Sequence, residues 1–343
     1  MKDTAVRTMK LSILIPVYGQ ADLARAAILS ASRYLGVVDE IRVVDDKPDD
    51  PLIAHHRDVV ESSERIRYSI NPVNLGRTGT YNRLLRECSS ELFLMLDGDD
   101  YLAPEVEFAP FAHEFEGDPD LVLVCGRCCE IHGDQALKTS GPLPRGRQAG
   151  LEYFQAWVGT QGLFPHSACI VRRSAAIACG GYPDEILNSD IALLRSVLLA
   201  GGARADETLM SYWRFHGSNA SKIADVDMIL ANFDSVLIPY RRGRLQGLDL
   251  ARWLARSTRT YLVSAFHQIM GAAGGHELPD YARLQASLVA LLARESPRAL
   301  WGVVSSWPKV LTLAAIRLAI GRARFARMMA RRGNYVYISG DAS

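Results

Sequence analysis

The first hundred residues alternate short apolar runs with longer segments of mixed polarity. Leu11–Val17, Glu40–Asp46 and Ile66–Ile70 are short apolar runs that predict strands. Between them, Ala21–Tyr34 has apolar residues at helical spacing, and a second helix is expected over Pro51–Ser62. Strands that alternate with helices in this way are typical of an α/β fold with a doubly wound, mostly parallel central sheet.

One stretch joins a buried strand to a cluster of carboxylates. Leu92–Leu96 is a continuous apolar run, which predicts a central strand covered on both faces, and Asp97-Gly98-Asp99-Asp100 follows it directly. Ligands of such sheets bind at the carboxyl ends of the strands. Carboxylate oxygens suit Mg²⁺ or Mn²⁺, so the stretch is either a metal site or an acidic surface turn.

The pattern after residue 100 is less regular. Strands are predicted at Leu121–Glu130, Ser167–Val171 and Thr208–Phe215, short helices at Leu151–Val158 and Ile191–Ala200, and a surface loop over the Gly/Pro/Arg-rich segment Lys138–Gly150. Asp190 stands where the helix to Ala200 begins, and Asp is a common residue at the cap of a helix. A carboxylate there therefore has two readings, a helix cap or a catalytic group.

The net charge of +1 conceals an acidic body and a basic C-terminal segment. Residues 1–221 contain 22 Lys/Arg and 30 Asp/Glu, whereas residues 222–343 contain 17 Lys/Arg and 8 Asp/Glu. The change of sign predicts a domain boundary near residue 222. A basic segment beside an acidic domain indicates contact with an anionic surface, either a membrane or nucleic acid.

The basic segment is predicted to be helical over Leu248–Met270, Tyr281–Arg294 and Trp301–Arg332. Its last part carries Trp and Leu together with Arg, which suits either an interfacial helix on an anionic bilayer, assigned to residues 297–343, or a helical cap with a solvated arginine face. Nucleic acid is not expected, because no recognised binding motif accompanies the arginines. No membrane-spanning helix is expected, because Arg317 interrupts the apolar run Val310–Ile320.

Cysteine usage and the N-terminus predict a cytoplasmic protein. Met1–Lys10 is polar and lacks the apolar core of a secretion signal. Only Cys125, Cys128 and Cys129 of the six cysteines cluster, within a predicted strand. No second Cys/His pair matches their spacing, so buried free thiols are favoured over a zinc site.

Taken in order, these segments resemble the family 2 glycosyltransferases, which have the GT-A fold and use a nucleotide-sugar donor. The matching pieces are Ser12–Tyr18, Val43–Asp46, Asn74–Asn82, Asp97–Asp100, Gly180–Glu185, Asp190 and Arg214–Ser221. The resemblance implies a GT-A catalytic domain over residues 1–221, with a nucleotide-binding half at about 1–100 and an acceptor half at about 101–221. Residues 222–343 would follow it as a basic helical region.

The resemblance implies a nucleoside pocket at the ends of the first two strands. Pro16 and Tyr18 would line this pocket, and Asp45 would accept a hydrogen bond from the base. A sugar nucleotidyltransferase, which is also α/β, is less favoured, because the first strand ends in Pro16-Val17-Tyr18 and not in a glycine-rich loop.

The resemblance also implies contacts to the diphosphate and the sugar. Asn82 would lie near the donor's ribose or phosphates, and Asp97 would contact the ribose or the sugar. The arginine usual before Asn82 is replaced by Tyr81, so the phosphate contact expected there passes to Arg77.

Metal binding and catalysis are implied for a further set of residues. Asp99 would ligate the Mn²⁺ or Mg²⁺ ion that bridges the diphosphate, with Asp97 and His216 as further ligands, and Asp100 either binds through water or caps the turn. Asp190 would be the general base. His166 would lie on the acceptor side.

Glycosyl transfer needs this equipment. The leaving nucleoside diphosphate develops negative charge that a divalent ion stabilises, and a separate carboxylate must take the proton of the acceptor hydroxyl. Direct displacement predicts inversion at the anomeric carbon. The resemblance implies a glycan or lipid-linked saccharide acceptor in bacterial-type cell-surface polysaccharide synthesis, with the enzyme in the cytoplasm or peripheral on the inner face of the membrane. The alternative is a non-catalytic nucleotide-sugar-binding module that organises a membrane assembly.

Overall fold

The chain forms two compact units. The computed structural model describes residues 10–132, 135–141, 145–159, 164–184, 186–216, 226–271 and 278–320, together with 324, 325 and 328. The first unit, here the sheet unit, comprises Met1–Phe154, Gly162–Asp184 and Ser189–Gly217. The second, here the helical unit, comprises Gln155–Gln161, Glu185–Asn188 and Ser218–Ser343.

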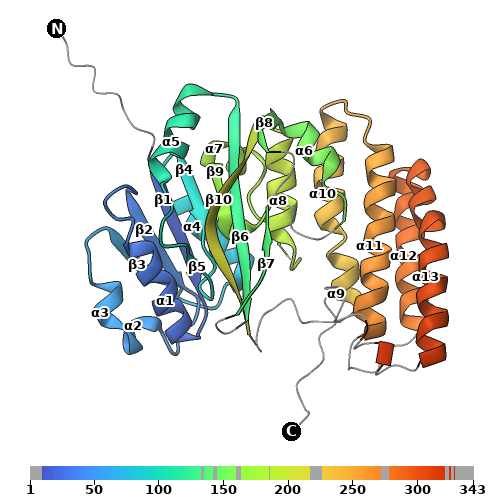
Figure 1. Cartoon of the computed structure of the whole chain (residues 1–343), viewed down its shortest axis with the longest axis horizontal. Coiled ribbons are helices and arrows are strands. Elements are labelled where there is room, and N and C mark those ends of the chain that lie inside the picture. The colour runs from blue at the N-terminus through green and yellow to red at the C-terminus, as the bar shows by residue number, and fades with distance from the viewer. Residues whose placement is uncertain are drawn as a thin grey trace. The chain divides into compact units, whose positions relative to one another are not determined.

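The sheet unit is built on one mixed sheet (Figure 1). Its strand order is β3-β2-β1-β4-β9-β6-β10-β5, and β7 pairs with β6 while β8 pairs with β10. The strands are β1 (Leu11–Val17), β2 (Glu40–Asp45), β3 (Ile66–Ile70), β4 (Leu92–Met95), β5 (Tyr101–Leu102), β6 (Leu121–His132), β7 (Gln135–Ser140), β8 (Gly146–Ala149), β9 (Cys169–Arg172) and β10 (Gly202–Phe215).

The first four strands follow the predicted pattern. β3, β2, β1 and β4 pair in parallel, and all four residues of β4 are buried, as the apolar run predicted. Beyond β4 the sheet is mixed, because β9 runs antiparallel to both β4 and β6, whereas β6 and β10 are parallel. The α/β fold class is confirmed, and the parallel arrangement is confined to the first half and the β6–β10 pair.

The loop expected over Lys138–Gly150 is wrong at both ends. Its start belongs to β7, and β8 occupies Gly146–Ala149. β8 has no apolar alternation, since it is formed by antiparallel main-chain pairing with β10. Such pairing leaves no pattern in the sequence of the edge strand.

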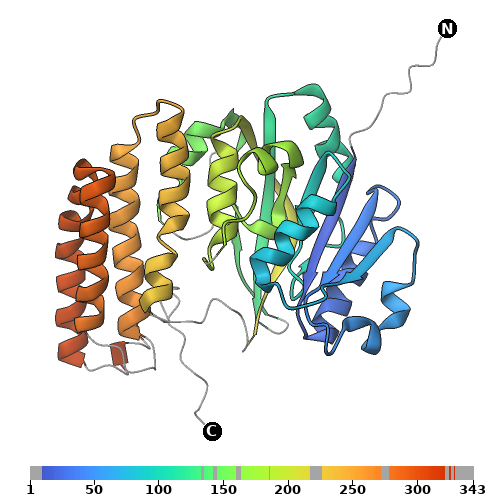
Figure 2. The ribbon, with the colours of Figure 1, turned by 180° about the vertical axis from the view of Figure 1, so that it is seen from behind.

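Helices cover both faces of the sheet. They are α1 (Ala21–Ser32), α2 (Leu52–His55), α3 (Arg57–Val60), α4 (Gly76–Glu87), α5 (Phe108–Gly117), α6 (Gly150–Ala156), α7 (Arg173–Ala178) and α8 (Ser189–Leu198), with the short 3₁₀ helix η1 (His166–Ala168). The views from the two sides show α1 on one face and α4 on the other (Figures 1 and 2). The single helix expected over Pro51–Ser62 is two short helices, because His56 leaves the helical region with φ −135° and ψ 54°.

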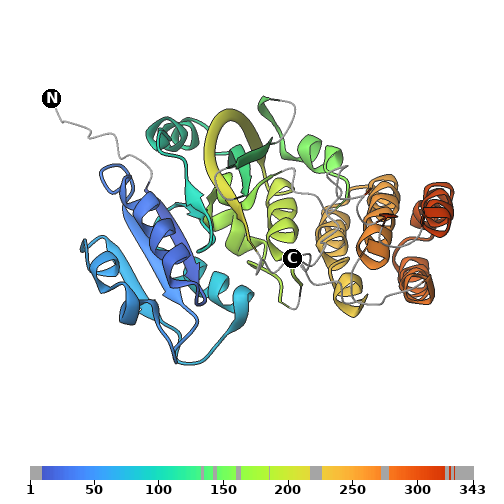
Figure 3. The same cartoon turned by 60° about the horizontal axis from the view of Figure 1, so that its bottom comes forward.

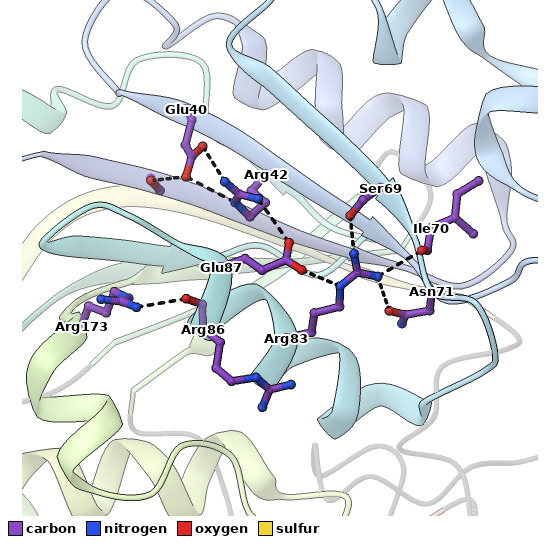
Figure 4. A network of polar contacts seen from close by, with 10 residues as sticks. Glu40, Arg42, Ser69, Ile70, Asn71, Arg83, Arg86, Glu87 and Arg173 are labelled. Atoms are coloured by element: carbon purple, nitrogen blue, oxygen red, sulfur yellow. Dashed lines mark hydrogen bonds and ion pairs between the residues drawn. The ribbon is translucent and has the colours of Figure 1, made fainter.

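A polar network fastens α4 to the sheet (Figure 4). Arg83 donates to the carbonyl of Ile70 at 3.1 Å, to Ser69 Oγ at 3.1 Å and to Glu87 at 2.8 Å. Glu87 also pairs with Arg42 of β2 at 3.2 Å. Partly exposed ion pairs each contribute little stability, but this connected set fixes the position of α4 along β2 and β3. The N-terminus of α4 therefore has a defined place at the carboxyl edge of the sheet.

The cysteines are free thiols, as predicted. Cys125, Cys128 and Cys129 are buried in β6 and form no disulfide. The described residues contain no group of three or more His, Cys, Asp or Glu side chains arranged to hold a metal, so the zinc interpretation fails for this cluster.

The described part of the helical unit contains α9 (Val226–Ala231), α10 (Asp234–Leu245), α11 (Ala251–Gly271), α12 (Leu278–Glu295), η3 (Pro297–Ala299) and α13 (Leu300–Ile320). Figure 3 looks nearly along these helices and shows α13 beside α12 at one edge of the unit. Within the described residues, Pro297–Ala319 is long and apolar enough to cross a membrane by length and composition. The expectation that no stretch qualifies is therefore wrong, since Lys309 and Arg317 are too few to exclude it. Arg322, Arg327, Arg331 and Arg332 lie outside the described residues.

Candidate active site

The acidic turn after β4 is held tightly against the end of β1. A Cβ atom on Gly98 would lie 2.5 Å from the carbonyl oxygen of Pro16, so only glycine allows this approach. The turn closes with a hydrogen bond from the Asp100 amide to the Asp97 carbonyl at 2.9 Å. The requirement for glycine explains why Asp97 and Asp99 are separated by a residue without a side chain.

Asp97 is held by two aromatic neighbours. The hydroxyl of Tyr81, which is buried in α4, donates to Asp97 Oδ1, and Nδ1 of His166 lies 3.8 Å from Oδ2. Burial is the largest influence and raises the pKa of Asp97, but His166, Tyr81 and Arg77 together outweigh it and leave the pKa below its usual value. Asp97 therefore carries its negative charge at neutral pH.

Asp99 and His216 form the pair best suited to a divalent cation. Nε2 of His216 lies 3.0 Å from Asp99 Oδ2, and the two side chains are 20% and 29% exposed. Burial and the charge of Asp97 raise the pKa of Asp99, and His216 opposes them. Carboxylate and imidazole suit Mn²⁺, and such ions take their remaining ligands from phosphates and water. The residues present therefore fit the expected metal, with Asp99 and His216 as ligands and Asp97 close enough to add its charge.

Arg214 joins the acidic turn to the end of β10. Its Nε donates to the Asp99 carbonyl at 2.6 Å, and its Nη2 reaches the carbonyls of Asp100 and Leu23 at 3.3 and 3.2 Å. Its backbone amide donates to Asp100 Oδ1 at 2.9 Å. The guanidinium also lies over the ring of Tyr101, 5.1 Å from its centre. Because Arg214 is two residues from His216, the clamp fixes both ends of the metal pair.

Asp100 is a structural residue of this clamp. It is only 2% exposed, and burial together with the charges of Asp99 and Asp97 raises its pKa well above the usual value. Its contact is the amide of Arg214, so of the two expected roles the geometry favours the one within the turn.

Arg77 is surrounded by the acidic groups of the site. It lies over the ring of Tyr81 at 5.7 Å, and the charges of Asp190, Asp97 and Asp99 raise its pKa against the opposing effect of burial. Asp190 is the second residue of α8, since the helix begins at Ser189. The structure therefore brings Asp190, 90 residues beyond the acidic turn in sequence, into the electrostatic range of the same guanidinium.

Asn82 and His166 are used inside the protein. The side chain of Asn82 donates to the Tyr182 carbonyl at 2.8 Å and accepts from the Tyr182 amide at 2.9 Å. His166, 9% exposed, contacts the Tyr182 hydroxyl at 2.8 Å. Gly181 has φ +74° and packs against Asn82, which explains the glycine in this loop. The direct donor contact expected of Asn82 is not what this geometry supports, because both functions of its amide are occupied.

Asp45 likewise differs from its expected role. It is fully buried, and its oxygens accept from the Lys47 amide at 3.0 Å, the Leu52 amide at 2.6 Å and the Tyr68 hydroxyl at 2.8 Å. Three donors occupy the carboxylate, so it orders the turn after β2 and has no exposed surface for a base. Tyr18, in contrast, is 62% exposed.

Sequence reasoning missed Arg214, Tyr182 and the structural use of Tyr81. A signal existed for Arg214 alone, since Arg214-Phe215-His216 belongs to the recognised motif. Residues 217–221 of that motif, and Glu185, lie outside the described residues.

Comparisons with known proteins agree with this geometry. Residues 12–180 match the model of the glycosyl transferase family 2. Comparison with curated proteins gives no match. Among solved structures, S. aureus TarS 1–349 in complex with UDP is similar with TM-score 0.54 and 14% identity, over 96% of this chain and 93% of that one. TarS 1–349 with UDP-GlcNAc gives 0.52 and 14% over the same shares.

A third structure is the mannosyltransferase PcManGT from Pyrobaculum calidifontis with GDP-Man and Mn²⁺, with TM-score 0.49, 16% identity and coverage of 91% and 87%. The family match and the shared fold confirm the resemblance read from the sequence. The chain is therefore a glycosyltransferase with a GT-A fold, and its residues 12–180 belong to glycosyl transferase family 2.

Proposed function

We propose that this enzyme transfers a sugar from a nucleotide-sugar to an acceptor hydroxyl, with a divalent metal and with inversion at the anomeric carbon. The observation that carries the proposal is the gathering of Asp97, Asp99 and Asp190 around Arg77. These carboxylates come from two separate segments, the turn after β4 and the start of α8. One group of charges can serve the leaving diphosphate, and the other carboxylate can serve the attacking hydroxyl.

The donor diphosphate would lie between the acidic turn and the N-terminus of α4. That end of a helix attracts anions, and Arg77 stands in its first turn. Asp99 and His216, with Asp97, would hold the metal, which when bound would neutralise the charge on the leaving diphosphate. Arg77 would then exchange its carboxylate neighbours for phosphate oxygens. Tyr18, exposed at the end of β1, offers a surface for the base.

Asp190 would accept the proton of the acceptor hydroxyl. A base on the opposite side of the sugar from the leaving group favours a single displacement, hence inversion. Proton NMR of the product early in the reaction tests this directly. A product with the donor's anomeric configuration would contradict it.

The donor that we test first is a UDP-sugar, because TarS, whose structure has the same fold, is described with UDP and UDP-GlcNAc. We infer a glycan or lipid-linked saccharide acceptor and action at the cytoplasmic side of a cell membrane. A thermal-shift series with UDP-, GDP-, dTDP- and CMP-sugars, with and without Mn²⁺, identifies the donor by a concentration-dependent rise in Tm.

Turnover is then measured as release of the nucleoside diphosphate with the donor so identified. We expect Asp99→Ala to abolish metal-stimulated turnover, and the surface variant Asp58→Ala, whose side chain is 68% exposed, to retain it. Absence of turnover with every donor in the wild-type enzyme, or equal turnover in Asp99→Ala, would contradict the proposal.

A further inference from the structure

The outer face of α13 is apolar along its whole length. Trp301, Val304, Trp307, Leu311 and Leu318 are 69, 45, 50, 66 and 74% exposed. Their spacing of three, four and seven residues places them on one side of the helix. Scattered exposed apolar residues are ordinary, but a continuous stripe of large ones marks a surface that binds something.

The opposite face of α13 is fixed against α11. A Cβ on Gly302 would lie 2.2 Å from the Ala255 carbonyl, so the two backbones are in close contact there. Val303, Ser306 and Val310 on the same face are buried. The helix therefore cannot turn its stripe inward without losing this packing, and the stripe remains available to a partner.

The charge of the C-terminal segment identifies the chemistry of that partner. Residues 297–343 contain eight Lys/Arg and a single acidic residue, Asp341. Arg298, Lys309 and Arg324 are exposed beside the stripe in the described structure. A second copy of the chain would bring two strongly positive segments together, which costs free energy. An anionic lipid surface satisfies the cations and the apolar residues at the same time.

We propose that α13 docks this enzyme on an anionic bilayer, lying in the interface with its apolar stripe in the acyl region. Trp301 and Trp307 suit this depth, because an indole has an apolar body and a polar N–H. Lys309 near the middle and the packed face toward α11 favour a helix that lies on the membrane over one that crosses it. The inference concerns the helical unit alone and does not depend on the donor or the acceptor.

The test is flotation of the full-length protein with vesicles. Phosphatidylcholine vesicles are compared with vesicles containing 30 mol% phosphatidylglycerol, roughly the anionic content that attracts basic helices. We expect binding to the anionic vesicles only, weakened at high salt, with a blue shift of tryptophan fluorescence. Leu311→Glu/Leu318→Glu should lower the bound fraction about tenfold or more, since two large apolar side chains leave the bilayer. Leu245→Glu is the control, because Leu245 is 90% exposed on α10, away from the stripe.

Several outcomes would overturn the proposal. They are absence of wild-type binding to anionic vesicles, equal binding of the Leu311/Leu318 variant, and a dimer in light scattering that this variant dissociates. Trp301→Phe/Trp307→Phe should remove most of the blue shift while preserving binding, and a blue shift unchanged in this variant also counts against the docking geometry. Unchanged thermal melting of each variant shows that the fold is retained. Donor hydrolysis in vesicle-free solution is measured separately, so failure of docking and failure of the proposed reaction give different results.

Discussion

Replacing Arg214 with methionine tests how the metal pair is built. Methionine keeps much of the length and apolar body of the arginine and removes the guanidinium. The donations to the carbonyls of Asp99, Asp100 and Leu23, at 2.6, 3.3 and 3.2 Å, are lost together. The amide of residue 214 remains, so its bond to Asp100 Oδ1 can persist.

The structure sets the size of the expected effect. A hydrogen bond of this kind contributes about 1 kcal/mol net, so three contribute about 3 kcal/mol. Arg214 is only partly buried, and water can replace some of the lost donors, which reduces the expected cost to about 2 kcal/mol. If that cost falls on the arrangement of Asp99 and His216, metal affinity decreases about 30-fold. Lysine at this position should recover part of the loss, because it keeps the charge but not the fork of donors.

The assay is the Mn²⁺ concentration that gives half-maximal release of nucleoside diphosphate, together with the urea-unfolding free energy. Arg204→Met is the matched control, since Arg204 lies in the same strand but pairs with Glu114 and Asp206. We expect the half-maximal Mn²⁺ concentration to rise in Arg214→Met and to stay unchanged in Arg204→Met. An Arg214→Met enzyme with wild-type Mn²⁺ dependence and wild-type stability would refute the clamp.

Three further predictions concern the general base, the orientation of Asp97 and a buried histidine. Asp190→Asn should lower kcat by about 10²- to 10⁴-fold while the donor Kd from titration stays the same; a changed Kd with an unchanged kcat would remove it as the base. Tyr81→Phe deletes the donor to Asp97 Oδ1 and should raise the donor KM about tenfold, whereas an unchanged KM would mean that Asp97 needs no such anchor. Burial, aided by the charge of Lys309, lowers the pKa of His267 to about 4, so its neutral form is favoured in the folded state and stability should fall as pH drops from 6.5 toward 4. Urea unfolding should show a loss of about 2 kcal/mol between pH 7.5 and 5 that His267→Gln largely removes; an equal loss in both proteins would contradict this assignment.

Elements defined by burial could be predicted from the sequence. β1 and β4 lie between covering layers, so their residues are continuous apolar runs, and burial follows from composition alone. β8 and the break at His56 could not be predicted in this way. The first depends on pairing with a distant strand, and the second on a single backbone conformation.

The site shows the same division between local and distant determinants. The acidic turn was visible because its residues are consecutive. The groups that orient it come from far along the chain, since Tyr81, His166 and Arg214 approach Asp97 and Asp99 only after the sheet has formed. Nothing in the local sequence of a tyrosine or an arginine reveals such a partner.

Asp45 and Asp99 show why residue type and position do not determine a role. Both follow parallel strands that end at the same edge of the sheet, and both resemble family residues. Asp45 is followed by a turn whose amides point back at its carboxylate, so the main chain occupies it and it has no exposed surface. Asp99 follows a glycine pressed against Pro16, its own carbonyl is taken by Arg214, and its side chain stays 29% exposed beside His216. A carboxylate can bind a cation only where the backbone around it is satisfied by other groups. At this edge of the sheet Arg214 meets that condition for Asp99, which makes an arginine that touches no substrate a determinant of where the metal can bind.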